Sequence, residues 1–404
     1  MPAGAQAAFR EVVQPGRAHA VAGDLRDGRH AAPRARASLA LTTYRGVVNA
    51  RSGLPARRYA VAVGAALVLA ACGGGDAAPP STSAPAPSSS PASPSPSATL
   101  PLPTPSPTNG IPVGASPFSG LPGGADKPVL VVKIDNTRAA QPHSGLQAAD
   151  LVYVEEVEWS LTRLAAVFST TLPDEIGPIR SARISDIDIV APFGRVAFSN
   201  SGAQTKLLPA LAAANIIDVS AGVAWDAFYD DPGRPTPVDH MADPTKLLVY
   251  APDAAKARDI GLVFSAEPPP GGQPVDTVSV TWPSSDISFT WDEAAGNYVV
   301  GLNGEESRST EGGPQRAATA VIQSVVQTDS GYGDRDGGKT PLVQTIGKGT
   351  ALVLRDGRMW SVTWERPDLQ SGTRFYLSDG TPMPFAIGQE WIVLMDRSLK
   401  PKVR

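Results

Sequence analysis

Apolar runs broken by short polar turns form the pattern of the chain from Pro117 onward. The runs at 128–136, 151–158, 162–170 and 195–201 have the length and side-chain types of buried strands, so they predict strands. Leucines recur at helical spacing in 205–215, and shorter helices are expected at 144–150 and 185–192. Strands alternating with helices predict an α/β layered domain over residues 117–268.

The run EPPPGGQP at 267–274 fits neither the strand nor the helix period and is the best internal boundary. Beyond it, alternating apolar and polar residues predict strands at 278–282, 288–293, 297–304, 318–328, 351–365, 373–385 and 389–395. Asp356-Gly357 and Asp379-Gly380 predict hairpin turns. We therefore expect a mostly antiparallel β domain over 275–400, and an α+β fold for the whole body.

An uncharged run at 59–71 follows Arg57 and Arg58 and ends in Leu69-Ala70-Ala71-Cys72. A bilayer span needs about 20 apolar residues, so this shorter run predicts the core of a signal peptide over 47–71. Its end resembles the lipobox of bacterial lipoproteins, which implies cleavage before Cys72 and acylation of that cysteine, for example with palmitate. The alternative is a free cysteine in a short buried helix. Residues 1–46 show no apolar period and are interpreted as an over-extended start.

Proline and serine dominate residues 72–116, which carry almost no charge and no apolar pattern. Such a segment cannot bury a core, so we expect a disordered tether behind the lipidated Cys72. Roughly 40 residues of polyproline II at about 3.1 Å each would reach on the order of 100 Å. The expected location is the cell membrane, with a lipid anchor and an outward-facing body in the cell envelope.

Charge and cysteine content exclude several classes of function. Of 35 basic and 39 acidic residues, 10 and 3 precede Cys72, so the remainder carries a net charge of −11. An acidic body gains nothing from counterion release at phosphate backbones, and we expect no nucleic-acid partner. Cys72 is the only cysteine, which excludes a thiol nucleophile or a cysteine zinc site in the body. We expect no metal site and no cofactor.

Ordered motifs in the body carry a family resemblance. They are KIDN at 133–136, HSGLQAADLVYVEEVE at 143–158, LTRLAAVF at 161–168, GPIRSAR at 177–183, VIQSVVQ at 321–327 and IGQEWIVLM at 387–395. In these motifs the chain resembles the YerB-like bacterial lipoprotein family over most of 117–397. The resemblance implies a surface lipoprotein with an N-terminal and a C-terminal domain of unknown function, and it implies no particular reaction.

One departure from the family pattern concerns a stretch that should lead through an arginine to Pro-His-Asn-Leu. This chain has YDDPGRPTPVDHMADP at 229–244 instead. Arg234 and His240 are the counterparts that the resemblance implies for a ligand site, although their spacing is altered.

Arg180 and Arg183 are the first candidates for ligand contacts. They lie three residues apart just before a predicted helix, where arginine forks and free N–H groups bind carboxylate or phosphate. The structural alternative is that both arginines form salt bridges with Glu155, Glu156 or Glu158 on the neighbouring strand.

Asp135 and Asn136 end the first strand, while Glu155 and Glu158 lie near the end of the next, where ligands of α/β sheets usually bind. Arg163, within LTRLAAVF, completes the candidate set. Strand alternation predicts that Glu156 and Glu158 share one face and Glu155 the other. Paired carboxylates could act as acid and base or hold a divalent cation, or could simply be solvated or ion-paired.

Two other features have ordinary structural explanations beside functional ones. Asp329, Asp334 and Asp336 lie in a glycine-rich segment without the spacing of a calcium loop, so a mobile hairpin loop is expected. Tryptophans of the C-terminal part either line a glycan groove or, as strand spacing favours, form core: Trp282, Trp291, Trp360, Trp364 and Trp391.

No complete catalytic motif occurs in the mature part, because G-x-S-x-G, H-E-x-x-H and S-x-x-K are all missing. We therefore expect a binding or accessory protein of the envelope that recognises an anionic ligand or a protein partner. The alternative is an envelope hydrolase or transferase that uses the carboxylates and arginines on a phosphate- or glycan-containing substrate.

Overall fold

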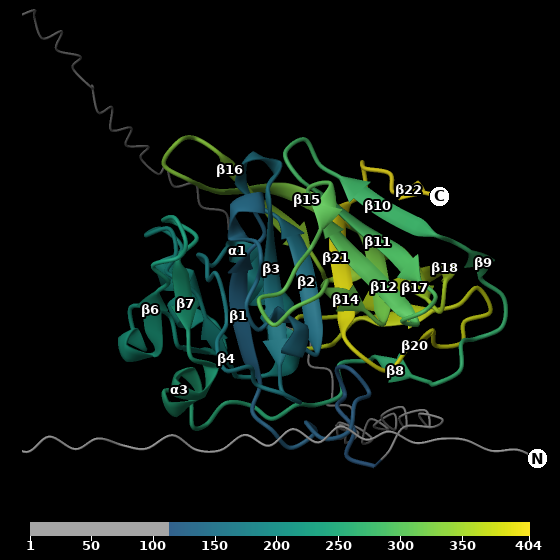
Figure 1. Ribbon diagram of the computed structural model, residues 1–404, viewed down its shortest axis with the longest axis horizontal. Helices are drawn as coiled ribbons and strands as arrows, with labels where there is room; N and C mark the ends of the chain where they lie inside the picture. The colour runs from purple at the N-terminus through teal and green to yellow at the C-terminus, as the bar shows by residue number, and fades with distance from the viewer. Residues whose placement is uncertain (1–112) are drawn as a thin grey trace, which may run out of the picture. The chain divides into compact units, whose positions relative to one another are not determined.

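A mixed sheet of 12 strands crosses the whole body in the computed structural model, which describes residues 113–404 (Figure 1). Its main path runs in the order β19 (Arg374–Tyr376), β18 (Arg358–Arg366), β17 (Gly347–Arg355), β15 (Thr319–Gly333), β21 (Glu390–Asp396), β2 (Leu151–Glu156), β3 (Thr162–Phe168), β1 (Leu130–Asp135), β4 (Val196–Ser199) and β5 (Ile216–Asp218). Two further strands, β16 (Lys339–Gln344) and β9 (Gln273–Pro274), pair with β15 and β18.

The join between the N-terminal and C-terminal parts is the parallel pair β2–β21, with Leu151 opposite Glu390 and Val154 opposite Val393. Strand β21 is also parallel to β15, whereas β15, β17, β18 and β19 follow one another antiparallel. Consequently one sheet runs through the boundary predicted at 267–274, and the described residues belong to a single compact unit.

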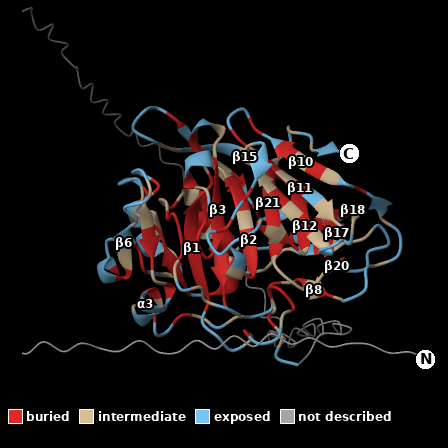
Figure 2. Ribbon diagram, in the orientation of Figure 1, coloured by how far each residue is buried: buried red, intermediate tan, exposed pale blue. Residues whose placement is uncertain are grey.

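A second sheet of six strands covers part of one face of the large sheet. It consists of β13 (Glu305–Glu306), β12 (Asn297–Leu302), β11 (Asp286–Asp292), β10 (Thr277–Thr281) and β22 (Lys402–Val403), with β14 (Arg316–Ala317) beside β12. Phe289 and Val300 of this sheet share a core with Val132 of β1 and Trp391 of β21. Figure 2 shows the result, in which β1 and β3 are buried along their whole length.

Short helices and small strand pairs complete the two faces. The helices are α1 (Ile184–Val190), α2 (Leu208–Ala213) and α3 (Pro244–Val249), with single 3-10 turns η1 (Arg138–Ala140), η2 (Leu146–Ala148), η3 (Glu158–Ser160), η4 (Ala191–Phe193) and η5 (Trp225–Ala227). The strand pairs are β6 (Phe228–Asp230) with β7 (His240–Ala242), and β8 (Val263–Phe264) with β20 (Pro384–Phe385). None of the helices within 113–404 is both long and apolar enough to cross a bilayer.

Most predicted strands are present, and Asp356-Gly357 forms the turn between β17 and β18. The helix expected at 144–150 is only the 3-10 turn η2, and the strand expected at 373–385 is limited to the short strands β19 and β20. The α/β layering expected over 117–268 is realised only in part. Helix α1 packs on one face through Ile189 and α3 on the other through Leu247, but each has only six or seven residues. The fold is therefore rich in strand, with mixed and antiparallel sheets and few helices. The predictions for 1–46, the signal peptide and most of the tether lie outside the described residues.

Candidate functional site

Three neighbouring strands bring candidate residues onto one face of the large sheet. Arg163 of β3 lies directly opposite Asp135 of β1 and directly opposite Glu155 of β2. Opposed residues on antiparallel strands point to the same face, so the three side chains adjoin one another. All three are buried, with at most 4% of the residue surface exposed.

The segment before α1 adds two arginines to this face. Ile179 forms a bridge with Ile134 of β1, and the Arg180 amide donates to the Lys133 carbonyl at 2.9 Å. Helix α1 then begins because the Asp186 carboxylate accepts the Arg183 amide at 2.6 Å, and an acid in the first turn also suits the helix dipole. Arg180 and Arg183 are thereby held over the strand ends.

Both arginines are engaged in salt bridges. Arg180 Nε lies 2.8 Å from Asp135 Oδ2, and Arg163 Nη1 lies 3.7 Å from Asp135 Oδ1. Arg183 binds Glu158 through Nε and Nη2 at 2.6–2.9 Å. The structural alternative therefore holds for Arg183 and Glu158, whereas Arg180 pairs with Asp135 rather than with a glutamate.

Lys133, which the sequence analysis did not single out, lies at the centre of the same group of charges. Its ammonium contacts Glu155 and lies 2.8 Å from Asp186 Oδ1, and all three side chains are fully buried. Burial lowers the pKa of Lys133, but Asp186 and Glu155 outweigh that effect and raise it above its ordinary value. Burial, reinforced by Asp186, raises the pKa of Glu155 to about 7 although Lys133 opposes the shift.

Glu158 lies on the side of Glu155, which corrects the expected alternation. Strand β2 ends at Glu156, and Glu158 belongs to the turn η3, so the period of two no longer applies. Burial raises the pKa of Glu158, but its hydrogen bonds to Arg183 prevail and the net direction is downward. Glu156 lies apart from the arginines, beside Ser160 and Trp282.

A long hairpin from the C-terminal part closes over these charges. We call β15, β16 and their tip at 334–338 the arm. Thr340 of the arm donates a hydrogen bond to Glu158, and the Trp159 indole donates to Asp334 Oδ2 at 2.6 Å. Trp159 has a φ of +61°, a conformation that is costly for a bulky residue. A Cβ at Gly338 would lie 2.5 Å from the indole nitrogen, so glycine permits this contact.

Asn136 and the buried His143 support the end of β1. Asn136 Nδ2 donates to Thr162 Oγ1 at 2.8 Å, and His143 Nε2 lies 2.7 Å from the Asp135 carbonyl oxygen. Burial lowers the pKa of His143. These contacts fix the strand end that carries Asp135.

Arg234 and His240 lie outside this group. Arg234 donates to the carbonyls of Ala140 and Pro142 at 3.1 and 2.6 Å, and His240 lies 2.7 Å from Asp230 and stacks on Phe228. Both belong to the β6–β7 hairpin or its loop. The Pro237 carbonyl of that loop accepts Arg180 Nη1 at 3.1 Å, which is the link between the hairpin and the arginines.

We call the eight charged side chains brought together here the charge cluster: Lys133, Asp135, Glu155, Glu158, Arg163, Arg180, Arg183 and Asp186. Four cations face four carboxylates, so the charges balance when all are ionised. Arg163 Nε and Glu155 Oε2 are buried without a hydrogen-bond partner among residues 113–404, and Arg180 keeps 27% of its side chain exposed. The cluster thus contains unsatisfied polar atoms, and Arg180 is more exposed than Arg183, whose side chain is 17% exposed.

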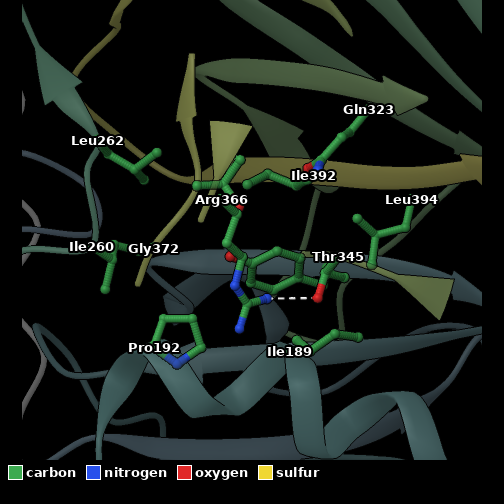
Figure 3. A pocket seen from close by; sticks show the side chains of 12 residues that line it. Ile189, Pro192, Ile260, Leu262, Gln323, Thr345, Arg366, Gly372, Ile392 and Leu394 are labelled. Atoms are coloured by element: carbon green, nitrogen blue, oxygen red, sulfur yellow. Dashed lines mark hydrogen bonds between the residues drawn. The ribbon is translucent and has the colours of Figure 1, made fainter. Parts of the chain in front are cut away.

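The remaining candidate features belong to the scaffold. Four of the five C-terminal tryptophans are buried and Trp291 packs beside Tyr298, as core residues do. Within 113–404 no three His, Asp or Glu side chains are arranged to hold a metal. The cavity in Figure 3, where buried Arg366 donates to Thr345 at 2.6 Å, has a volume of about 10 Å³. That volume suits one water molecule rather than a ligand.

Comparison with known proteins gives matches to both parts of the body. Residues 118–258 match the family described as the N-terminal domain of a protein of unknown function (DUF3048), and residues 278–392 match its C-terminal domain. This chain is 25% identical over 276 residues to YerB of Bacillus subtilis (strain 168), a protein whose name describes it as a proposed lipoprotein. The match covers 66% of this chain and 80% of YerB. The crystal structure of Bacillus subtilis YerB shares the fold, with a TM-score of 0.60 at 20% identity, covering 71% of this chain and 99% of that one.

Proposed function

Because the chain belongs to the YerB-like DUF3048 family, whose two domains match more than half of its residues, we propose that it is a lipid-anchored protein of the cell envelope that binds an anionic ligand at the charge cluster. The ligand would be a carboxylate or phosphate carried by an envelope component or a partner protein. Anchoring would occur through acylated Cys72, with the body facing outward.

Ligand binding is supported by the exposure of Arg180 and by the unused hydrogen-bond donor of Arg163. The Arg180 side chain is partly exposed, and its Nη1 donates to the Pro237 carbonyl as its one partner within the described residues. Arg163 Nε behind it has no hydrogen-bond partner within 113–404. A ligand carboxylate or phosphate would replace the carbonyl and receive charge-assisted hydrogen bonds, which are roughly twice as strong as neutral ones.

Arg180→Ala tests this proposal better than a change at Arg183, because Arg183 is mostly buried in its pair with Glu158. We expect Arg180→Ala to abolish binding of inorganic phosphate, citrate or soluble wall fragments, measured by calorimetry on protein that circular dichroism shows to be folded, and to lower the melting temperature as well because buried Asp135 loses its partner at 2.8 Å. Arg180→Lys keeps the charge but loses the fork, and should bind more weakly than the parent. Unchanged binding in Arg180→Ala would refute the assignment of the site.

The proposed anchor has a separate test. Cys72→Ser in the full chain should move the protein from the membrane fraction to the soluble fraction, and mass spectrometry of the parent should show an acylated N-terminal cysteine. Retention of the apolar leader on an unmodified cysteine would contradict the anchor while leaving the ligand site standing.

A second candidate function is hydrolysis or group transfer, which is favoured by the carboxylates that adjoin arginines in the charge cluster, together with Glu155, whose pKa is raised by burial. A carboxyl with a pKa of about 7 suits proton transfer near neutral pH. Glu155→Gln and Glu158→Gln would then remove turnover of lipid-linked or wall precursors. Absence of turnover by the parent chain across such a panel would reject this candidate.

A further inference from the structure

An open groove with a volume of about 440 Å³ lies on the C-terminal part of the large sheet. Its floor includes Ile322 and Ser324 of β15, Leu352 of β17, Ser361 of β18 and Met395 of β21. Its wall is formed by Arg397, Leu399, Lys400 and Pro401. We call this feature the C-terminal groove. Its volume is within the usual range of small-molecule sites, roughly 300–1,000 Å³.

The groove exists because the six-stranded sheet covers only part of the face on which it packs. Strand register places Val393, Ile322, Leu352 and Ser361 in one row across β21, β15, β17 and β18. Met395 pairs with Ser324, and Thr350 pairs with Thr363, on the same face one step further along the strands. Val393 is fully buried and outside the lining, so the open strip lies over β15, β17 and β18, and three strands span about 10 Å at a spacing of about 4.8 Å.

The floor combines apolar and hydroxyl side chains. Ile322 and Met395 are almost wholly buried and Leu352 is half-buried, while Ser361, Thr350 and Thr363 are exposed. Among the described residues, no carboxylate lines the groove. Such a surface suits an apolar chain, which gains free energy from every Å² removed from water.

Two cations stand on the wall of the groove. Arg397 and Lys400 are both exposed, and neither forms a salt bridge within residues 113–404. The adjoining hollow shares Thr350 and Thr363 with the groove, and it adds Lys348 and one carboxylate, Glu365. The joined lining therefore carries three cations against one carboxylate, which complements an anionic group.

We propose that the C-terminal groove binds a single-chain amphiphile, with the acyl chain on the floor and an anionic head group at Arg397 and Lys400. This site is distinct from the charge cluster, because the cluster lies on β1–β3 and on the opposite face of the large sheet. A body held beside a membrane would meet such molecules at high local concentration.

Calorimetric titration of residues 113–404, which form a compact unit, with 12-carbon probes below their micelle concentrations tests the proposal. Laurate and dodecyl phosphate should both bind, whereas dodecyltrimethylammonium, with the same chain and the opposite charge, should bind at least about tenfold more weakly. A preference between the two anions identifies the head group as carboxylate or phosphate. Failure of both anions to bind, or equal binding of the cation, overturns the proposal.

Variants distinguish binding in the groove from binding to the protein surface in general. Arg397→Gln with Lys400→Gln should weaken laurate binding about tenfold, and Ser361→Trp, at an exposed strand position, should block the floor and remove binding. The matched control, Lys206→Gln with Arg335→Gln, removes the same charge from exposed sites elsewhere and should leave binding unchanged. If phosphatidylglycerol vesicles bind through Arg397 and Lys400 while Ser361→Trp has no effect, the surface is a membrane contact and the groove proposal is wrong.

Discussion

Replacement of Lys133 by methionine is the most informative test of the charge cluster. Among residues 113–404, Lys133 is the only cation that forms a salt bridge with Asp186 or with Glu155, and none of the three side chains is exposed. Methionine has a similar length and no charge, so the change leaves two carboxylates in a buried place without their cation. Removing one partner of a buried ion pair costs about 3–5 kcal/mol, a large part of the roughly 5–15 kcal/mol that stabilises an ordinary domain.

The loss in free energy of unfolding caused by Lys133→Met should depend on pH, and the direction of that dependence can be worked out. Without Lys133 the pKa of folded Glu155 rises further above its unfolded value of 4.5, since Lys133 lowers it in the parent. A carboxyl whose folded pKa is raised contributes its full stability below its unfolded pKa and loses it as the pH rises through the folded pKa. The free-energy deficit should therefore be larger at pH 8 than at pH 5.

Urea unfolding followed by tryptophan fluorescence measures the free energy of unfolding for both proteins at each pH. The triple variant Lys133→Met, Glu155→Gln, Asp186→Asn removes the stranded charges, and we expect it to recover most of the loss. A deficit below about 1 kcal/mol, or one that does not shrink at low pH, would refute the view that Lys133 neutralises these carboxylates.

Three further predictions concern the scaffold and the arm. Trp391→Ala should lower the free energy of unfolding by about 3–5 kcal/mol in urea titrations, because the indole is fully buried between the sheets; a loss under about 1.5 kcal/mol would contradict that burial. Asp150→Ala should cost about 2–4 kcal/mol in the same assay, since Asp150 accepts from the hydroxyl of Ser119 and the amides of Ser169 and Thr170 at 2.6–2.9 Å. Asp334→Ala should speed amide hydrogen exchange at 334–338, because this carboxylate accepts the Trp159 indole and the Gly338 amide; unchanged exchange there would show that the tip is held by other contacts.

Most strands could be predicted from the sequence because each one is marked by its own apolar run or its own alternation of apolar and polar residues. The run VLVVKIDN also contained a signal for Lys133 that we missed. A continuous apolar run predicts a strand buried on both faces, so a lysine within it must be buried and needs carboxylate partners. Its partners Glu155 and Asp186 lie on other elements, and a single sequence does not show which carboxylates come near.

Candidate residues of the cluster were predicted as a group, but their pairing was not. Strand ends that carry Asp135 and Glu155 were expected near Arg180 and Arg183, and the structure brings them together. The closure by Thr340 and Asp334 depends on the arm, which comes from the C-terminal part and meets Trp159 in an unusual backbone conformation. No periodic pattern predicts a contact of that kind.

The parallel pairing of β2 with β21 constrains when the body can fold. Strand β2 has β3 on one side and can find its other neighbour only near the end of the chain, at Glu390–Asp396. Contacts so distant in sequence form slowly, because a long loop must close first. If the chain is threaded through a membrane from its N-terminus, the first half emerges with an open sheet edge and must be kept from sticking to other chains until the last strand arrives.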